Sequence, residues 1–204
     1  MATSSKRWLN AQLRDPYVKQ ARKSQYRSRA VYKLLEIDEK DKLFYQGQTV
    51  VDLGASPGGW SQYVIGRIGT QGKLISVDIL PMEKLDNVLF IKGDFTETTV
   101  YEACINNLAN GKADLVISDM SPNLTGIRNT DQARSMYLAE LVFEFSCRVL
   151  QPGGSILLKL FQGQGADTFK SEIMDKFHRV VVRKPKASRH RSREFYILAT
   201  GYKV

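Results

Sequence analysis

Cysteine is scarce in this chain, and long apolar runs are missing. Its 204 residues include only two cysteines, Cys104 and Cys147, which lack the close spacing of a zinc motif. We therefore expect no disulfide framework and no metal site, and we interpret both thiols as core residues. No apolar run approaches the roughly 20 residues that cross a bilayer, and the N-terminus lacks the apolar core of a signal peptide. These absences predict a cytoplasmic protein that does not associate with membranes.

Acidic residues are almost missing from two segments. Residues 1–33 hold nine Lys or Arg against one acid, Asp15, and residues 179–193 hold seven Lys or Arg and no acid. Because the whole chain has a formal net charge of +9, the remainder is mildly acidic. Clustered cations of this kind indicate a polyanionic partner such as RNA. A disordered basic tail that serves solubility is the alternative, but Trp8, Tyr17 and Tyr26 interleave the first segment and would help it dock.

The rest of the sequence alternates short apolar runs with amphipathic segments. This alternation predicts an α/β fold with a mostly parallel sheet, one antiparallel strand near the end, and helices on both faces. We expect a single domain, 1–204, with a basic N-terminal extension at about 1–33. The first clear helix covers 27–41, with Ser28 as its N-cap; later helices cover 60–68, about 98–108, 131–150 and 166–177. The predicted strands are 49–53, 73–77, 88–92, 113–118, 155–160, 180–183 and 194–200.

A glycine-rich turn follows the first predicted strand. Gly54, Gly58 and Gly59 separate that strand from the helix that starts at Trp60. Glycines let a ligand approach the backbone closely, and the helix N-terminus offers unpaired N–H groups. The acid Asp78 ends the second strand, as an acid that binds ribose hydroxyls does in a nucleotide site. We interpret the turn as a nucleotide-type binding corner; an ordinary tight connection is the alternative.

Polar residues end the later strands as well. Asp94 follows the third strand, Asp119 the fourth, and Lys159 lies near the end of the fifth. Ligands of open α/β sheets bind at the carboxyl ends of the strands, where these side chains converge. Lys159 stands in the apolar run Leu-Leu-Lys-Leu-Phe, so burial requires a partner, and Asp119 on the neighbouring strand is the natural one. A purely structural Lys–Asp pair remains the alternative.

Four long motifs resemble one enzyme family. They are residues 52–62 (Asp-Leu-Gly-Ala-Ser-Pro-Gly-Gly-Trp-Ser-Gln), 118–123 (Ser-Asp-Met-Ser-Pro-Asn), 158–163 (Leu-Lys-Leu-Phe-Gln-Gly) and 192–201 (Ser-Arg-Glu-Phe-Tyr-Ile-Leu-Ala-Thr-Gly). In this order they resemble the FtsJ/RrmJ family of ribosomal RNA ribose methyltransferases, in its bacterial large-subunit (RlmE) branch. The resemblance extends from about Arg7 to the end of the chain. It implies a Rossmann-like, S-adenosylmethionine-dependent methyltransferase fold with a seven-stranded sheet.

The resemblance also implies a substrate and a set of site residues. The substrate would be a uridine ribose 2′-hydroxyl in the A-loop of 23S rRNA, within the large (50S) ribosomal subunit, and the enzyme is expected to be a monomer. Carried over position by position, the catalytic set falls on Lys33, Asp119, Lys159 and Glu194. The S-adenosylmethionine contacts fall on Gly58, Trp60, Asp78, Asp94 and Asp119. Ser56 stands where the family commonly has alanine, a change small enough to leave the loop intact.

The chemistry of the residues agrees with these roles. A ribose hydroxyl is a weak acid, so its methylation is helped by a base and by strict positioning. A lysine becomes a base when desolvation or a second cation favours its neutral form, and Lys33 is such a cation. Asp119 favours the charged form instead. Our hypothesis is that Lys159 removes the proton of the ribose hydroxyl and that Asp119 orients Lys159. Lys33 and Glu194 would position the ribose.

Four other functions are compatible with parts of the sequence. An NAD-dependent oxidoreductase shares the glycine corner, but the loop is not G-x-G-x-x-G, and Pro57 removes an N–H donor that a pyrophosphate needs. A base methyltransferase would need an aromatic residue after Asp119, where this chain has Ser-Pro-Asn. A non-catalytic RNA-binding module would leave the buried lysine without a purpose. Within the methyltransferases, transfer RNA remains an alternative substrate because phosphate contacts carry no sequence information.

Overall fold

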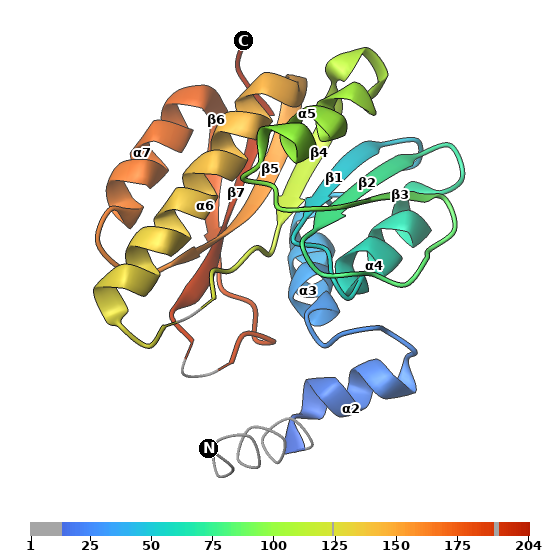
Figure 1. The fold of residues 1–204 in the computed structure, drawn as a ribbon, viewed down its shortest axis with the longest axis horizontal. Helices are drawn as coiled ribbons and strands as arrows, with labels where there is room; N and C mark the ends of the chain where they lie inside the picture. The colour runs from blue at the N-terminus through green and yellow to red at the C-terminus, as the bar shows by residue number, and fades with distance from the viewer. Residues whose placement is uncertain (1–13, 124, 190–191) are drawn as a thin grey trace.

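Seven strands form one twisted sheet with helices on its two faces (Figure 1). The computed structural model describes residues 14–123, 125–189 and 192–204. Within these ranges the strand order is β3-β2-β1-β4-β5-β7-β6. Among the described strands β7 alone runs against its neighbours, since it pairs antiparallel with both β5 and β6. The predicted α/β fold, with a mostly parallel seven-stranded sheet and one antiparallel strand, is confirmed.

Most element bounds agree with the predicted ranges to within about three residues; β5 and the start of α3 differ more. The strands are β1 (Thr49–Leu53), β2 (Lys73–Asp78), β3 (Val88–Lys92), β4 (Ala113–Ser118), β5 (Leu150–Phe161), β6 (Phe177–Arg183) and β7 (Glu194–Tyr202). The helices are α2 (Pro16–Lys23), α3 (Val31–Asp41), α4 (Gly59–Ile68), α5 (Thr98–Asn106), α6 (Arg128–Val149) and α7 (Ala166–Lys176), with a 3₁₀ turn at Ala109–Gly111. Strands β1, β3 and β4 have the predicted ends.

Strand β5 is twice as long as predicted. It begins at Leu150, where Pro152 and the following glycines had indicated a helix stop and a loop before residue 155. Leu150 pairs with Ala113, whereas Ser155 pairs with Leu115, so the register shifts between these pairs. The extra residues pair irregularly with β4 at the start of β5, and a bulge of this kind tolerates proline and glycine.

The predicted start of α3 is wrong. The helix begins at Val31 rather than Arg27, and within the described residues no side chain caps its N-terminus. The predicted cap, Ser28, instead lies against Gly59 of α4, where its Oγ would be 2.3 Å from a Cβ added to that glycine. Residues 24–30 thus form a connection that crosses the start of α4. The tertiary contact determines its conformation, and the local capping preference does not.

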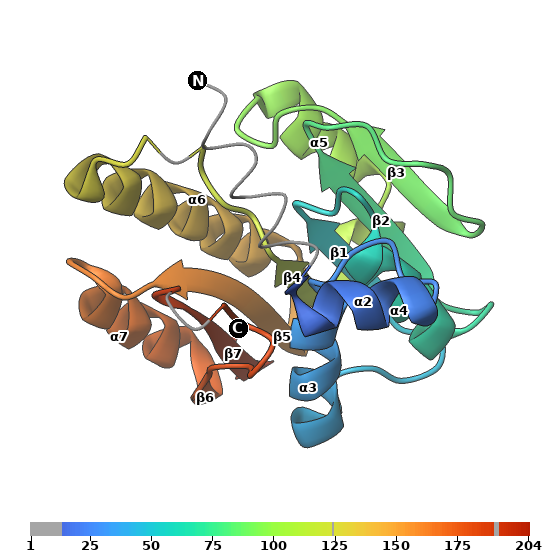
Figure 2. The same cartoon turned by 90° about the horizontal axis from the view of Figure 1, so that it is seen from below.

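The sheet has a helical layer on each face. Side chains alternate along β1: Val51 and Leu53 pack against the layer of α5, α6 and α7, while Val50 and Asp52 face α3 and α4. The views in Figures 1 and 2 show these two layers, with α2 lying outside both. The central strands are therefore buried on both sides, and we expect the chemistry at the edge where the strands end.

Helix α2 belongs to the basic N-terminal segment and docks onto α3. Its N-cap Asp15 binds Arg29 at 2.9 Å, and the rings of Tyr17 and Tyr32 lie 5.5 Å apart. Tyr26 meets Tyr32 edge to face at 6.0 Å. The aromatic residues therefore dock the described part of this segment, as the sequence predicts. Residues 1–13, which include Trp8, lie outside the described residues.

Candidate active site

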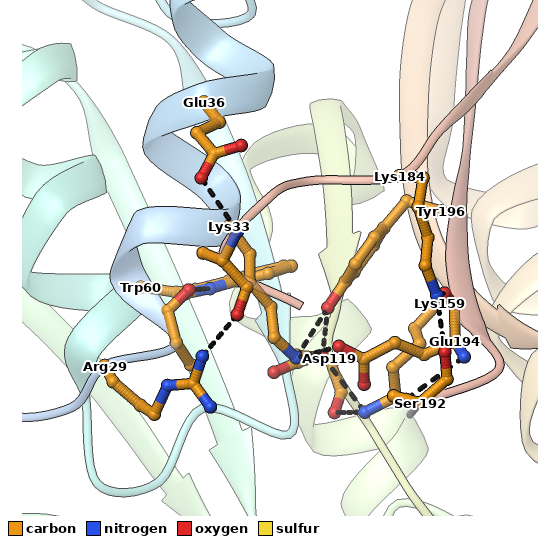
Figure 3. A network of polar contacts seen from close by, with 12 residues as sticks. Arg29, Lys33, Glu36, Trp60, Asp119, Lys159, Lys184, Ser192, Glu194 and Tyr196 are labelled. Atoms are coloured by element: carbon orange, nitrogen blue, oxygen red, sulfur yellow. Dashed lines mark hydrogen bonds and ion pairs between the residues drawn. The ribbon is translucent and has the colours of Figure 1, made fainter. Parts of the chain in front are cut away.

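The four residues of the predicted catalytic set come together from four elements. Lys33 extends from α3, Asp119 follows β4, Lys159 lies on β5 and Glu194 begins β7. Figure 3 shows their side chains pointing toward one another. All four side chains are largely buried, with exposed fractions between 5% and 17%.

The carboxylate of Asp119 lies at the centre of this cluster. Its Oδ1 accepts a hydrogen bond from Lys159 Nζ at 3.0 Å and lies 3.7 Å from Lys33 Nζ. The Lys159 ammonium also donates to the main-chain oxygen of Asp119 at 2.5 Å. On the other side, Lys33 Nζ pairs with Glu194 Oε1 at 2.9 Å. Two ammonium groups and two carboxylates thus form one connected, electrically balanced network. The prediction that Asp119 is the buried partner of Lys159 is confirmed.

Tyr196 is a member of the cluster that the sequence analysis missed. Its hydroxyl donates to Asp119 Oδ1 at 2.7 Å and lies 3.1 Å from Lys33 Nζ. Tyr196 stands directly opposite Lys159 in the β5–β7 pairing, and it lies two residues after Glu194, on the same face of β7. Because side chains alternate along a strand, the predicted site residue Glu194 could have indicated Tyr196 two residues later.

Burial and the two lysines act in opposite directions on the carboxylates. Burial favours the protonated form of Asp119, but the charges of Lys159 and Lys33 outweigh it and hold the pKa of Asp119 below its usual value. The pKa of Glu194 is lowered in the same way, mainly by Lys33 against the effect of burial. Burial, with the charge of Asp119 added, raises the pKa of Tyr196 well above its usual value. At neutral pH both acids are therefore ionised, and the phenol is a donor.

The basic connection between β6 and β7 is anchored beside this cluster. Glu36 of α3 accepts hydrogen bonds from the main-chain N–H of Lys186 and Ala187 at 2.6 and 2.9 Å. Lys184 donates to the main-chain oxygens of Ser192, at 2.7 Å, and Glu194 (Figure 3). The second cationic segment therefore reaches the start of β7 in a fixed position next to Glu194.

The glycine corner has the local geometry that the sequence predicts. Gly58 occupies the N-cap of α4 with φ of +101°, and Gly54 has φ of +81°, backbone conformations that favour glycine. A Cβ added to Gly54 would lie 2.7 Å from the Met120 side chain. The turn therefore lies close against the residue that follows Asp119. This contact places the corner beside the cluster around Asp119.

Asp78 ends β2 and holds the corner in place. One of its carboxylate oxygens accepts a hydrogen bond from the main-chain N–H of Ser56 at 2.8 Å, and the other accepts from Leu80 at 2.8 Å. Asp94 follows β3, and its Oδ1 accepts from the main-chain N–H and the hydroxyl of Thr96 at 2.9 and 2.8 Å. Each acid thus fixes its own loop, and both stand at the same edge of the sheet as Asp119.

The side chain of Trp60 is buried against Tyr196 of the cluster. Its ring is only 3% exposed, lies 5.9 Å from the ring of Tyr196, and donates from Nε1 to the main-chain oxygen of Ala30 at 2.8 Å. The indole therefore joins α4 to the start of α3 and to β7. Its main chain, in the first turn of α4, is the part that faces the glycine corner.

Asp52 is a second residue near the glycine corner that the predicted site did not include. It is completely buried at the end of β1, and its Oδ2 accepts a 2.6 Å hydrogen bond from Ser61. Its Oδ1 has no hydrogen-bond partner among the described residues. Burial raises the pKa of Asp52 to about 7, with smaller contributions from the charges of Asp119 and Asp78. The corner therefore contains an unsatisfied buried acceptor.

The acids along this edge determine which class of cofactor fits. Asp78 and Asp94 place carboxylates at this edge that repel a pyrophosphate and favour a ligand with cationic groups and hydroxyl donors. An S-adenosylmethionine-type donor carries a sulfonium, an ammonium and ribose hydroxyls, so the residues fit it. The same argument disfavours the oxidoreductase alternative.

Other functional features are few in the described part of the chain. Among residues 14–123, 125–189 and 192–204, no group of three or more His, Cys, Asp or Glu side chains is arranged to hold a metal ion. No helix in those ranges is long and apolar enough to cross a membrane. Both cysteines are free thiols; Cys104 is buried as predicted, whereas Cys147 is only partly buried.

Comparison with known proteins identifies the family. The model of the FtsJ-like methyltransferases matches residues 26–202. The chain is 52% identical to the ribosomal RNA large subunit methyltransferase E of Pseudomonas aeruginosa and 50% identical to that of Stutzerimonas stutzeri, covering 98% of this chain and 97% of each relative. A crystal structure of a ribosomal RNA methyltransferase from Plasmodium falciparum superposes with a TM-score of 0.74 at 26% identity, over 87% of this chain and 98% of that one. Together with the clustered Lys33, Asp119, Lys159 and Glu194, these matches show that the chain belongs to the FtsJ-like methyltransferase family.

Proposed function

We propose that this enzyme transfers a methyl group from S-adenosylmethionine to the 2′-oxygen of a uridine ribose in the A-loop of 23S rRNA, in the large ribosomal subunit. The observation that carries the proposal is the buried network of Lys33, Asp119, Lys159 and Glu194 beside the glycine corner. The rRNA substrate is supported by relatives of about 50% identity that are named for large-subunit ribosomal RNA. With that substrate, the enzyme would work in the cytoplasm, as a monomer.

The cofactor would lie along the carboxyl ends of β1, β2, β3 and β4. When bound, it supplies an electrophilic methyl group on sulfur. The main chain of Gly58 and Trp60 would hold it at the start of α4, where N–H groups are free of helical partners. The carboxylates that would bind its polar groups are those of Asp78, Asp94 and Asp119.

Lys159 is the proposed base. Once Lys159 has released its own proton to solvent, its neutral Nζ would accept the proton of the ribose 2′-hydroxyl, and Asp119 would hold that nitrogen in place through the hydrogen bonds already present. Lys33 lies 3.7 Å from the same carboxylate oxygen, so two cations share one anion. Glu194 and Lys33, paired at 2.9 Å, would position the ribose.

The surface around the cluster suits an RNA strand. Arg128, Gln132, Gly163 and Arg193 line a cavity of about 360 Å³, and a second cavity of about 390 Å³ is lined by Lys170, Lys184, Arg193 and Glu194, among others. Cationic and amide side chains in such hollows bind phosphates and base edges. Glu194 belongs to both the cluster and the second cavity, which supports the proposal that RNA bound there would extend toward Lys159.

The test supplies tritiated S-adenosylmethionine with three substrates in parallel: large subunits from a strain that lacks this activity, naked ribosomal RNA, and bulk transfer RNA. We expect label in the large subunits, recovered after alkaline hydrolysis as a resistant dinucleotide, because a 2′-O-methyl group blocks cleavage of the adjacent phosphodiester. Label confined to transfer RNA would contradict the proposed substrate. Alkali-sensitive label would contradict ribose methylation. The Lys159→Ala protein in the same assay measures the background.

A further inference from the structure

The segment of residues 25–33 lies across the glycine corner and connects it to the basic helix α2. We propose that Arg27 is a positioning residue that couples binding of the methyl donor to binding of RNA. The inference rests on the proposed function, since it concerns the same two ligands. It assigns a role to a residue outside the predicted catalytic and cofactor sets.

Arg27 clamps two loops that border the cofactor edge. Its guanidinium donates to the main-chain oxygens of Glu83 at 2.6 Å and Lys84 at 2.9 Å, and it lies 3.5 Å from that of Pro57. Glu83 and Lys84 belong to the irregular stretch between β2 and β3, which begins directly after Asp78. Pro57 belongs to the glycine corner. One side chain therefore ties together the two backbone segments on either side of the proposed donor site.

The main chain of the same segment is fixed to α4. Gln62 accepts a hydrogen bond from the N–H of Arg27 at 3.1 Å and donates to the main-chain oxygen of Gln25 at 2.9 Å. A single amide side chain thus satisfies two groups of the segment. This contact holds Arg27 against the first turns of α4, the helix that begins at the corner.

The adjacent glycines of the corner make room for this segment. A Cβ added to Gly58 would lie 2.9 Å from Nη1 of Arg27, and a Cβ on Gly59 would lie 2.3 Å from Oγ of Ser28. The segment therefore occupies the space that side chains at these positions would need. Close approach of residues 27–28 is a second reason for glycine there, besides the approach of a ligand.

The segment continues directly into the catalytic cluster. Ala30 accepts the 2.8 Å hydrogen bond from the Trp60 indole, and three residues later Lys33 pairs with Glu194. In the other direction it leads to α2, where Lys19, Arg22 and Lys23 are exposed. A contiguous stretch thus contacts the donor corner, the catalytic lysine and the cationic surface.

These contacts give a physical route by which donor binding and RNA binding can affect each other. A donor bound beside Asp78 contacts the stretch that carries the carbonyl acceptors of Arg27, and Arg27 transmits that contact to residues 25–33 and to α2. The bound donor thereby favours the placement of α2 that binds RNA, which is a coupling free energy between the two sites. Because coupling is reciprocal, bound RNA raises the affinity for the donor by the same factor.

The experiment measures the affinity of large ribosomal subunits for the protein by filter binding, with and without saturating S-adenosylhomocysteine. The ratio of the two dissociation constants is the coupling factor. For the unaltered chain we expect a factor between about 5 and 50, typical of coupled sites. In Arg27→Ala the factor falls to about one, and in Arg27→Lys it falls nearly as far, because an ammonium cannot reproduce the forked contacts. Thermal melting confirms that both variants are folded.

Lys19→Ala is the matched control, since it removes one charge from the exposed face of α2. It weakens subunit binding equally in both conditions, so the coupling factor stays at the wild-type value. A wild-type factor of about one, or an Arg27→Ala factor equal to that of the unaltered chain, overturns the inference. Failure of the proposed function appears separately, as the absence of methyl transfer from the unaltered protein to the same subunits.

Discussion

Helix α3 carries a charged contact at each end, and both contacts reach the β6–β7 hairpin. At one end Lys33 meets Glu194 at 2.9 Å; at the other, Asp41 accepts two hydrogen bonds from Arg183, each of 2.6 Å. The Asp41–Arg183 contact is a complete two-point pair, in which each oxygen of the carboxylate has its own donor. The Lys33 end is crowded instead: three donors, Lys159, Tyr196 and Lys33, surround Oδ1 of Asp119.

We expect this difference to separate a structural pair from a catalytic one. The Asp41 carboxylate lies outside the predicted site and has both oxygens paired with one guanidinium, so we expect it to contribute to stability. An oxygen shared by three donors leaves each of them incompletely satisfied, so a substrate hydroxyl can take over one contact without leaving a charge unpaired. Changes at the Lys33 end should therefore reduce catalysis, and changes at the Asp41 end should reduce stability.

The largest loss of activity is expected for Lys159→Ala. Removal of the proposed base should lower kcat by about 10²–10⁴-fold, the range for a positioned general base. The affinity for S-adenosylmethionine should stay nearly unchanged, because Asp78 and the glycine corner are intact. Single-turnover transfer to large subunits measures the first quantity, and equilibrium dialysis with labelled donor measures the second. Turnover close to that of the unaltered chain would refute the role of Lys159.

Lys33→Met should have the next largest effect. It removes the second cation next to Asp119 and the partner of Glu194 but keeps the aliphatic stem, so we expect kcat to fall by about 10²-fold. Lys40→Met, an exposed change on the same helix, is the control and should leave kcat unaltered. If both variants lose activity equally, the loss reflects α3 in general and not the position of the Lys33 ammonium.

Much of this site could be predicted because its residues follow the strand pattern. Asp119 and Lys159 lie at the ends of adjacent strands whose apolar runs are unambiguous, and a buried lysine needs a carboxylate within reach. The fold itself follows from the same runs, since parallel strands buried on both faces are almost continuously apolar. The resemblance to a family was needed to assign roles to Lys33 and Glu194, which periodicity alone does not single out.

Other parts could not be predicted because tertiary contacts overrode local preferences. Ser28 has the chemistry of an N-cap, yet it packs on Gly59, and the helix begins three residues later. Pro152 has the chemistry of a breaker, yet β5 includes it, because the pairing of Leu150 with Ala113 tolerates the irregularity. The clamp made by Arg27 acts on main-chain oxygens far away in sequence, and no local pattern marks such acceptors.

Tyr196→Phe should have a smaller effect on catalysis than either lysine change. The ring keeps its contact with Trp60, and only the hydroxyl that donates to Asp119 is lost. A hydrogen bond to a charged group contributes about 1.5–3 kcal/mol, and the two lysines that remain compensate in part, so we expect kcat to fall by roughly tenfold. Single-turnover kinetics would show this directly. An unchanged kcat would mean that the hydroxyl is not needed to orient Asp119.

Arg183→Met should leave kcat nearly unchanged and lower stability. It removes the two-point partner of Asp41, whose side chain is 3% exposed, so we expect a loss of about 1–3 kcal/mol in urea unfolding at pH 7. Arg179→Met is the control: this arginine lies 3.7 Å from Asp41 but is 56% exposed, and its loss should cost less than about 0.5 kcal/mol. Equal costs for the two variants would contradict the structural role of the Arg183 pair.

The pH dependence of this loss provides the sharper test of the comparison. The hydrogen bonds from Arg183 outweigh burial and hold the pKa of Asp41 below its usual value, whereas in the unfolded chain it returns to about 3.9. Stability gained from a lowered pKa is fully present above the unfolded value and disappears as pH falls through the folded one. The difference between the unaltered chain and Arg183→Met should therefore be constant from about pH 5 to 8 and shrink below about pH 4. If the difference in free energy of unfolding persists in acid, Arg183 stabilises the hairpin through packing of its aliphatic stem. The ion pair at the Asp41 end of α3 would then not be the structural pair that the comparison requires.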